Sequence, residues 1–325
     1  MTKALTELNL PLPLYSRGKV RNTYEIPGNE NSLLVVTLDR ISVGDEPLQS
    51  GIPMTGFFLN QLSGFWFKRL EDIIPNHLIT CSTTESLFGL DLTKRQIRAL
   101  KARVMLVKKL DPILAECIVS GYLYGSLLAE YEKALEESPG EQVCVFGHWL
   151  PMGMKRAQKL PFPIFRPTTK APAGEHDKPL TYEEFVDHLD QWLKTKPNSK
   201  IRMNAEDLAQ FLRSTSVALY MAASSYTEGH GYIMPDGKME FGADHLTGTI
   251  YWIDEGFTPH SSRFWLKYHY KPGQEQDSYD KDPIRNYVKK TGKKVLPKDL
   301  INQTQERWSK LFSGIIGLKI GQTFD

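Results

Sequence analysis

The chain has 325 residues, of which 41% are hydrophobic and 24% are charged, a composition typical of globular proteins and not of disordered or fibrous chains. Its 40 Lys and Arg residues nearly balance its 38 Asp and Glu residues, so no strong overall field draws it to nucleic acid or to an anionic membrane. The length allows about two domains, each with its own core.

The N-terminal part is predicted to be rich in strands. Residues 16–25 and 32–37 alternate polar and apolar side chains around a Pro-Gly-Asn turn, which predicts a β-hairpin. Residues 57–70 carry apolar side chains at helical spacing and predict a helix that packs on a sheet. Two further apolar runs, 103–107 and 115–119, predict another pair of strands.

The C-terminal part combines an irregular stretch with helices and a hairpin. Residues 138–178 are rich in Pro and Gly and predict a long irregular loop, a feature that is usually functional or disordered. Thr181 opens a capping box ahead of an amphipathic helix, and Asn204 can cap a second helix that runs to about residue 226. A second hairpin and a terminal helix are predicted at 232–241, 248–254 and 301–320.

These elements predict an N-terminal β-rich lobe, 1–110, and a C-terminal α/β lobe, 111–325. The cysteines at 81, 117 and 144 form neither a disulfide framework nor a metal-ligand pattern. The first residues lack the apolar segment of a secretory signal, and no segment approaches the about 18 apolar residues of a membrane span. We therefore expect a cytoplasmic protein with no membrane or nucleic-acid partner, and the sequence does not distinguish a monomer from a homo-oligomer.

A basic turn near the N-terminus is a candidate phosphate site. Gly18 lies among Arg17, Lys19 and Arg21, where a glycine lets the backbone approach an anion and the cations neutralise the charge. No Walker or dinucleotide-binding glycine pattern accompanies it. A solvated basic strand is the alternative interpretation.

Carboxylates and a lysine alternate on a predicted strand. Asp236, Lys238 and Glu240 would point to one face, and the pairing strand could bring Asp254 alongside them. Magnesium usually takes one or two carboxylates together with phosphate oxygens, while a lysine can hold a second anion. The alternative is a solvated hairpin with an exposed ion pair.

Two loops, 258–263 and 280–285, combine polar side chains with an arginine. Such groups can form charge-assisted hydrogen bonds with a phosphate or a carboxylate. By themselves they are more typical of structural capping.

An ordered series of motifs resembles the SAICAR synthetase family over nearly the whole chain. It runs from Gly18-Lys19-Val20-Arg21 through Glu116-Cys117-Ile118-Val119 and Thr169-Lys170-Ala171 to Lys238-Met239-Glu240 and Ser261-Ser262-Arg263. The resemblance implies an antiparallel β lobe and an α/β lobe with an ATP cleft between them. It also implies an ATP-dependent ligase that activates the carboxylate of carboxyaminoimidazole ribonucleotide as an acyl phosphate, from which the amine of aspartate forms the amide.

The resemblance also implies roles for individual residues. It implies ATP and Mg2+ as cofactors, small-molecule carboxylate and amine substrates, and a family-like loop at 169–177 that keeps water from the acyl phosphate. The catalytic centre would comprise Lys238, Asp236 and Glu240, with Glu240 and Asp254 as metal ligands. ATP would contact Gly18, Lys19, Val20, Arg21, Val107, Lys108 and Glu116. The substrates would contact Ser120, Ser126, Lys170, His260, Ser262, Arg263 and Arg285.

The match departs from the family at positions that would face the substrates. Ser120 stands where the family usually has an arginine, and His260 where it usually has an aspartate. Loss of a charged hydrogen bond of about 1.5–3 kcal/mol would weaken binding roughly ten- to a hundredfold unless another cation compensates. Three hypotheses follow: SAICAR synthetase activity with a divergent pocket, a relative that joins another carboxylate or amine in a specialised-metabolite pathway, and a nucleotide-binding pseudoenzyme.

Overall fold

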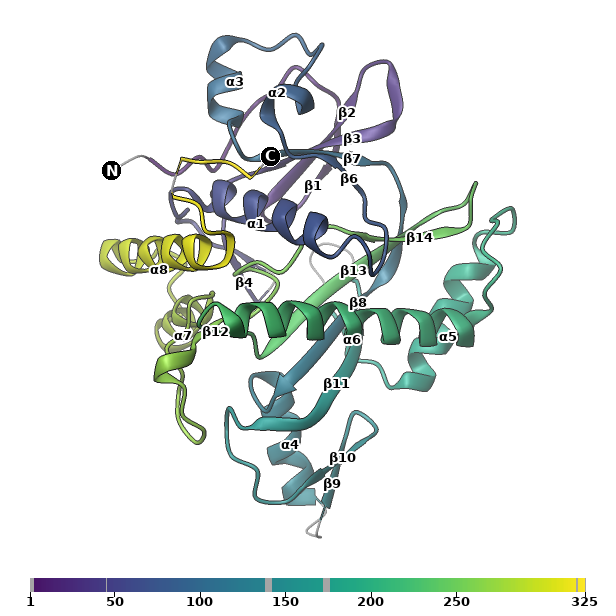
Figure 1. The fold of residues 1–325 in the computed structure, drawn as a ribbon, viewed down its shortest axis with the longest axis vertical. Helices are drawn as coiled ribbons and strands as arrows, with labels where there is room; N and C mark the ends of the chain where they lie inside the picture. The colour runs from purple at the N-terminus through teal and green to yellow at the C-terminus, as the bar shows by residue number, and fades with distance from the viewer. Residues whose placement is uncertain (1–2, 45, 138–141, 172–175, 320, 325) are drawn as a thin grey trace. The chain divides into compact units, whose positions relative to one another are not determined.

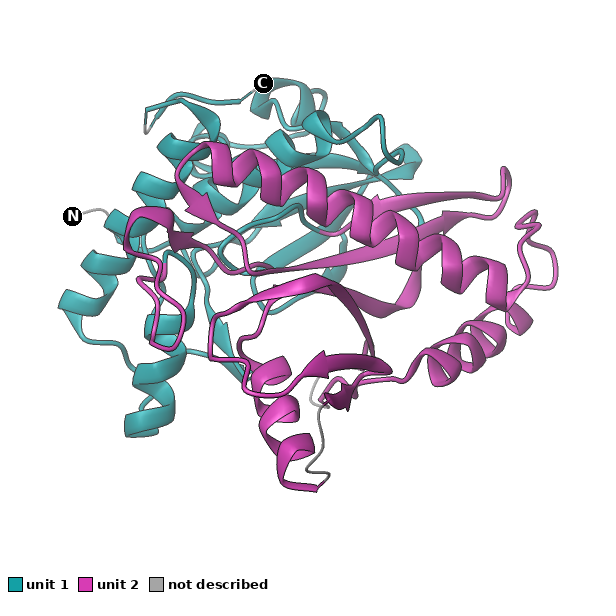
Figure 2. Cartoon of the chain, turned by 60° about the horizontal axis from the view of Figure 1, so that its bottom comes forward, with its two compact units in different colours: residues 1–110, 255–260, 279–325 teal, residues 111–254, 261–278 magenta. Residues whose placement is uncertain are grey.

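The chain divides into two compact units, which Figure 2 shows in different colours. The computed structural model describes residues 3–44, 46–137, 142–171, 176–319 and 321–324. Unit 1 comprises residues 1–110, 255–260 and 279–325, and unit 2 comprises residues 111–254 and 261–278.

Unit 1 is built on a five-stranded antiparallel sheet with the order β1-β2-β3-β7-β6 (Figure 1). In that order the strands are Leu14–Arg17, Arg21–Ile26, Asn29–Thr37, Val104–Lys108 and Leu78–Thr80. Leu34 and Val36 of the central strand β3 pack into an apolar cluster with Leu87, Leu100 and Val104. Because successive side chains of a strand point to opposite faces, the neighbouring buried residues of β3 face the other side of the sheet.

Helices α1, Thr55–Arg69, and α8, Lys298–Ile316, pack together in unit 1. Phe57 and Phe58 of α1 contact Phe312 of α8, with ring centroids 5.1 and 5.9 Å apart. This apolar contact is why the C-terminal residues group with unit 1, whereas the sequence analysis placed all of 111–325 in one lobe. The shorter elements of unit 1 are β4 Ser42–Val43, β5 Glu46–Pro47, α2 Thr83–Ser86, α3 Lys94–Leu100 and α7 Asp282–Thr291.

Unit 2 is built on a four-stranded antiparallel sheet with the order β11-β8-β13-β14. In that order the strands are Lys159–Thr169, Asp111–Tyr122, Asp236–Asp244 and Thr249–Ile253. The register of β8 and β13 places Glu116 opposite Glu240 and Ser120 opposite Asp236, and Ile164 of β11 also lies opposite Ser120. Polar residues that are far apart in the sequence therefore occupy neighbouring positions on two strands, with β11 beside them.

Helix α6, Ala205–Gly229, runs along this sheet and contacts β8, β11 and β13, and α5, Tyr182–Lys194, packs on α6 (Figure 1). The two predicted N-caps are confirmed: Thr181 accepts a hydrogen bond from the backbone of Glu184, and Asn204 from that of Asp207. The remaining elements of unit 2 are α4 Ser126–Glu137, β9 Gln142–Val145, β10 His148–Pro151, β12 Tyr232–Ile233, β15 Trp265–Leu266 and a 3-10 turn, Lys267–His269.

Two expectations about the strands are wrong. The stretch 138–178 is not an irregular loop, because its described residues contain β9, β10 and β11. Strand β11 lies at the edge of its sheet, where Pro161, Pro163 and Pro167 are tolerated because an edge strand does not need every N–H group for a ladder; its outer side is bridged to Pro179 at Thr168. The predicted strand pair 103–107 and 115–119 separates into β7 and β8, which belong to different sheets. In the part of the chain that the structure describes, no helix combines the length and the apolar character needed to cross a bilayer.

Candidate active site

A chain of alternating charges lies across the sheet of unit 2. Lys238 and Glu240 are two residues apart on β13, so their side chains share one face, and Glu116 reaches that face from β8. Lys238 Nζ donates to Glu116 Oε1 at 2.6 Å and to Glu240 Oε1 at 2.7 Å. Lys170, which follows β11, donates to the other oxygen, Oε2, of Glu240. Three strands therefore position two carboxylates and two ammonium groups in one connected series.

Burial and charge set the protonation of this series. Burial raises the pKa of Glu116 above its usual value, against the opposing charge of Lys238. Burial and the charge of Asp254 would also raise the pKa of Glu240, but Lys238 and Lys170 outweigh them and hold it below its usual value. Burial lowers the pKa of Lys170, and the charges of Glu240 and Asp254 more than reverse this, so the net shift is upward. Glu240 and Lys170 are therefore charged at neutral pH, and Glu116 accepts a proton more readily than Glu240.

Asp254 stands at the edge of the same series. It follows Ile253, which lies opposite Glu240, and its charge acts on both Glu240 and Lys170. Its φ of 70° is left-handed, a conformation that Asp adopts more readily than most residues with a Cβ.

The predicted magnesium ligands are Glu240 and Asp254, and both carboxylate oxygens of Glu240 accept hydrogen bonds from lysines. Within the described ranges, no group of three or more His, Cys, Asp or Glu side chains is arranged to hold a metal ion by itself. Magnesium usually keeps several waters and binds one or two carboxylates together with substrate phosphates. Glu240 and Asp254 remain the predicted ligands of such an ion.

Asp236 has a different partner from the one that the sequence analysis expects. Residues 261–263 run beside β13, with Lys238 N donating to Ser261 O at 3.1 Å and Ser262 bridging to Gly237. This path brings Arg263 to Asp236, and the Arg263 side chain forms an ion pair with Asp236 Oδ2. Among the described contacts, Asp236 therefore belongs to an arginine pair and not to the series of Lys238 and Glu240.

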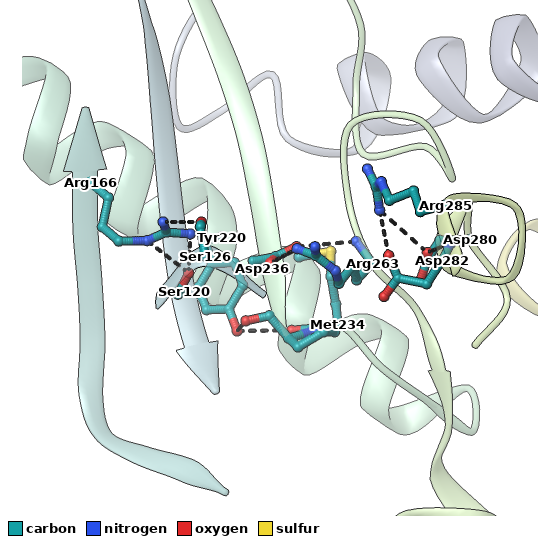
Figure 3. A network of polar contacts seen from close by, with 11 residues as sticks. Ser120, Ser126, Arg166, Tyr220, Met234, Asp236, Arg263, Asp280, Asp282 and Arg285 are labelled. Atoms are coloured by element: carbon teal, nitrogen blue, oxygen red, sulfur yellow. Dashed lines mark hydrogen bonds and ion pairs between the residues drawn. The ribbon is translucent and has the colours of Figure 1, made fainter. Parts of the chain in front are cut away.

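A second polar group of unit 2 surrounds Ser120 (Figure 3). Arg166 of β11 donates to Ser120 Oγ from Nη2 at 2.9 Å and from Nε at 3.2 Å, and to Ser126 Oγ from Nη1 at 3.0 Å. Ser126 is exposed at the start of α4, whereas Ser120 and Ser262 are buried. Arg263, the partner of Asp236, lies in the same unit.

The predicted nucleotide residues lie in unit 1, except Glu116. Gly18, Lys19 and Val20 form the turn between β1 and β2, closed by a hydrogen bond of 2.8 Å from Gly18 N to Arg21 O. Arg21 Nη2 lies 3.5 Å from Glu255 Oε1. The predicted adenine contacts are adjacent on β7, where Val107 is buried and Lys108 exposed.

His260 and Arg285 also lie in unit 1. Both ring nitrogens of His260 are buried and have no hydrogen-bond partner among the described residues. Burial, followed by the charges of Lys281, Arg21 and Arg285, holds the pKa of His260 well below its usual value, so the imidazole is neutral. Arg285 forms ion pairs with Asp282 at 2.5 Å and Asp280 at 3.8 Å.

Comparison with known proteins identifies the family to which the chain belongs. The sequence profile described as SAICAR synthetase matches residues 14–299. The chain belongs to the SAICAR synthetase family. The phosphoribosylaminoimidazole-succinocarboxamide synthases of Geotalea uraniireducens and Thermodesulfovibrio yellowstonii are 38% identical over 324 residues and 39% over 319. These alignments cover 98% and 96% of this chain and 99% and 98% of the relatives.

Solved structures agree with this SAICAR synthetase assignment. The SAICAR synthase of Saccharomyces cerevisiae, solved as a complex with SAICAR, superposes with a TM-score of 0.79 at 33% identity and covers 98% of this chain and 99% of its own. A SAICAR synthetase solved with ADP has a TM-score of 0.63 at 21% identity, covers 94% of this chain and 99% of its own, and supports the fold alone. The predicted mixed α/β fold is confirmed, and the chain is an enzyme, an ATP-dependent ligase of purine biosynthesis.

The sequence analysis did not identify Arg166 as a candidate site residue. The residue lies in the Pro-rich stretch that was read as a loop, so its position on a strand beside Ser120 was not expected. An arginine that follows the apolar run Ile164-Phe165 and precedes a proline was the available signal. Of the predicted family loop at 169–177, residues 172–175 lie outside the described part of the chain.

Proposed function

We propose that this chain joins carboxyaminoimidazole ribonucleotide to aspartate with the consumption of ATP, forming the succinocarboxamide that gives the family its name. The observation that carries the proposal is the connected series Glu116, Lys238, Glu240 and Lys170, with Asp254 at its edge. Full-length relatives named phosphoribosylaminoimidazole-succinocarboxamide synthase support it, and they favour this reaction over one in a specialised-metabolite pathway.

The reaction has two steps. One carboxylate oxygen of the ribonucleotide attacks the γ-phosphorus of ATP, the bond to the β,γ-bridging oxygen breaks, and ADP leaves. The amine of aspartate then attacks the acyl carbon, loses a proton, and phosphate leaves with the electrons of the C–O bond. Phosphorylation converts a poor electrophile into one with a good leaving group, so the protein contributes mainly positioning and charge neutralisation.

The ammonium groups of Lys238 and Lys170 are the residues placed to neutralise phosphoryl oxygens. Each is held by a carboxylate, so its position is fixed before the substrates bind. Glu240 and Asp254 would hold Mg2+, which supplies Lewis-acid neutralisation of the phosphates when bound. Glu116 holds Lys238 in position, and we keep the prediction that Glu116 also contacts ATP.

We assign proposed roles to the other predicted residues, first those of unit 1 and then those of unit 2. In unit 1, the turn Gly18–Arg21 is proposed to contact the phosphates of ATP, Val107 and Lys108 the adenine, and His260 and Arg285 a substrate. In unit 2, we assign substrate contacts to Ser120, Ser126, Ser262 and Arg263. Asp236 is a positioning residue in this scheme, because its carboxylate fixes the guanidinium of Arg263. The partners are small molecules, and the pathway supports a cytoplasmic location.

A product assay tests the proposal. Purified protein is incubated with Mg2+, ATP, carboxyaminoimidazole ribonucleotide and aspartate, and the succinocarboxamide is quantified by chromatography with mass detection. We expect product that requires all four components and that falls by at least about a hundredfold in Lys238→Met, which lacks a preorganised charge. Release of phosphate without this product, or with another acid or amine only, would overturn the assignment.

A further inference from the structure

Arg166 is a buried cation whose described hydrogen-bond partners are uncharged. Its side chain extends from β11, and the residue is 6% exposed. Its three nitrogen donors bond to the hydroxyls of Ser120 and Ser126, and among the described residues no carboxylate lies within ion-pair distance of it. A buried arginine normally pairs with a carboxylate, because removing a charge from water costs several kcal/mol. The hydroxyls and the ring of Phe146, whose centroid lies 5.5 Å from Arg166 Cζ, carry no formal charge and leave most of this positive charge unneutralised.

The charge of Arg166 persists at neutral pH. Burial lowers its pKa to about 10, with the charge of Asp236 opposing that shift and the charge of Arg263 adding to it. Asp236 forms its ion pair with Arg263. The local balance of these three residues is therefore two guanidinium groups against one carboxylate, an excess of positive charge.

The excess charge faces the beginning of α4. Arg166 Nη1 donates to Ser126, the first residue of this 12-residue helix. The guanidinium of Arg263 lies against Gly125, since a Cβ added there would be 2.8 Å from Nη2. Backbone N–H groups and the positive end of the helix dipole add to the attraction for an anion at this point. The exposed position of Ser126 opens the group to solvent.

The position of Arg166 also accounts for the departure at Ser120. The resemblance implies an arginine at that position, where this chain has a small hydroxyl residue. Arg166 lies opposite Ile118 on the neighbouring strand, two residues before Ser120, so its side chain emerges on the same face as that of Ser120. The truncated side chain at position 120 leaves space that the guanidinium of Arg166 enters, and the two are hydrogen bonded (Figure 3).

We infer that Arg166 binds the phosphate monoester of the ribonucleotide substrate and takes the place of the arginine expected at position 120, an inference that rests on the proposed function. A phosphate monoester carries nearly two negative charges and three strong acceptor oxygens at neutral pH. The guanidinium groups of Arg166 and Arg263, the hydroxyl of Ser126 and the first N–H groups of α4 are the complementary donors. Arg166 is thus a specificity-determining residue supplied by β11 instead of β8.

Substitution of Arg166 tests the inference through the separate Michaelis constants. In Arg166→Met we expect the KM for the carboxylated ribonucleotide to rise about ten- to a hundredfold, with the KM values for ATP and aspartate within about twofold of wild type. Arg166→Lys, which keeps the charge without the two-pronged geometry, should give an intermediate loss. Arg213→Met, which removes an exposed arginine of the same unit, is the matched control and should leave all three values unchanged.

Calorimetric titration separates the phosphate from other anions of the substrates. The probe is aminoimidazole ribonucleotide, which has the phosphate and lacks the ring carboxylate. We expect Arg166→Met to weaken this probe by the same factor as the carboxylated ribonucleotide. A loss confined to the carboxylated compound would assign Arg166 to the carboxylate, and a rise in the KM for aspartate alone would assign it to the amine substrate. Either result overturns the inference.

Transfer of the arginine between strands gives the sharpest test. The double substitution Ser120→Arg with Arg166→Ser moves the guanidinium to β8, and we expect it to recover most of the ribonucleotide affinity that Arg166→Ser alone loses. An equal loss of ribonucleotide affinity in Arg166→Ser and in the double variant would refute the inference that Arg166 takes the place of an arginine at position 120. If the wild type forms no succinocarboxamide, the proposed function fails, whereas titration of the phosphate-bearing probe still decides the role of Arg166. Thermal unfolding of each variant shows whether a loss of ribonucleotide affinity arises from misfolding. If the other variants misfold, the KM for the ribonucleotide in Arg166→Lys tests the inference instead.

Discussion

Replacement of Lys238 by methionine removes one ammonium group from the charge series of unit 2 while keeping most of the side-chain volume. Lys238 contacts Glu116 at 2.6 Å and Glu240 at 2.7 Å, and these three side chains are 22, 16 and 4% exposed. The substitution leaves Glu116 without its cation, whereas Glu240 keeps Lys170. Stability and activity should both fall.

The loss of stability follows from these contacts. Removal of one partner of a buried ion pair costs about 3–5 kcal/mol. The partial exposure of Lys238 and the remaining Lys170 place the expected value near the lower end, about 3 kcal/mol at pH 8. For a unit of this size the corresponding drop in Tm is about 6–12 °C. At pH 5 the loss should be smaller, because burial raises the pKa of Glu116 and the uncompensated carboxylate takes up a proton more readily at the lower pH.

Differential scanning calorimetry at pH 8 and pH 5 measures both effects. Lys194→Met removes a lysine whose side chain is 73% exposed and paired with Asp190, and it should leave Tm unchanged at both pH values. Glu116→Gln combined with Lys238→Met should recover part of the loss, since it removes the uncompensated carboxylate. A Tm within about 1 °C of wild type at pH 8, or a loss that is the same at both pH values, would refute the electrostatic reasoning.

Three further predictions concern packing, pH and a buried ion pair. Gly121→Ala should lower the free energy of unfolding by about 1–3 kcal/mol in urea titration, because the new Cβ would lie 2.2 Å from Tyr220 Oη, and an unchanged midpoint would contradict this. The pKa of His260 is lowered, so the unfolded chain binds a proton below about pH 6.5 that the folded chain does not, and stability should fall by up to about 1.4 kcal/mol per pH unit as the pH drops below that value. His260→Leu should remove this slope in urea titrations at pH 7.5, 6.5 and 5.5, and the same slope in both proteins would count against it. Asp39→Ala should cost about 3–5 kcal/mol by equilibrium unfolding, because Asp39 accepts from Arg103 Nη1 at 2.9 Å and the guanidinium would be left buried, whereas a loss under 1 kcal/mol would show that solvent reaches it.

Local sequence patterns predicted the elements that depend only on residues close together in the sequence. The caps at Thr181 and Asn204 depend on side chains within three residues of the helix start, and both were found. Strand alternation likewise placed Lys238 and Glu240 on one face. The hairpin predicted at 232–241 and 248–254 is found at 236–244 and 249–253, where Gly248 supplies a left-handed turn residue between the two strands.

Partners from distant segments could not be read from the sequence. Asp236 obeys the same alternation as Lys238, yet it pairs with Arg263, because the path of residues 261–263 beside β13 is a tertiary feature. Arg166 was hidden for a related reason, since prolines predict a loop unless the strand is known to lie at a sheet edge. The ends of α8 were located approximately, but its packing on α1 depends on contacts across most of the chain length.

Unit 1 is built from three separate segments of the chain, so its fold can be completed only after the third segment has been synthesised. Trp308, Leu311, Phe312 and Ile315 of α8 are fully buried, so the core beneath α1 stays open until α8 has left the ribosome. All residues of unit 2 are synthesised before α8. Vectorial synthesis usually completes N-terminal regions first, but here the region that is made first is the last to close. A premature stop codon within α8 would therefore damage the opposite end of the polypeptide from the one that it truncates.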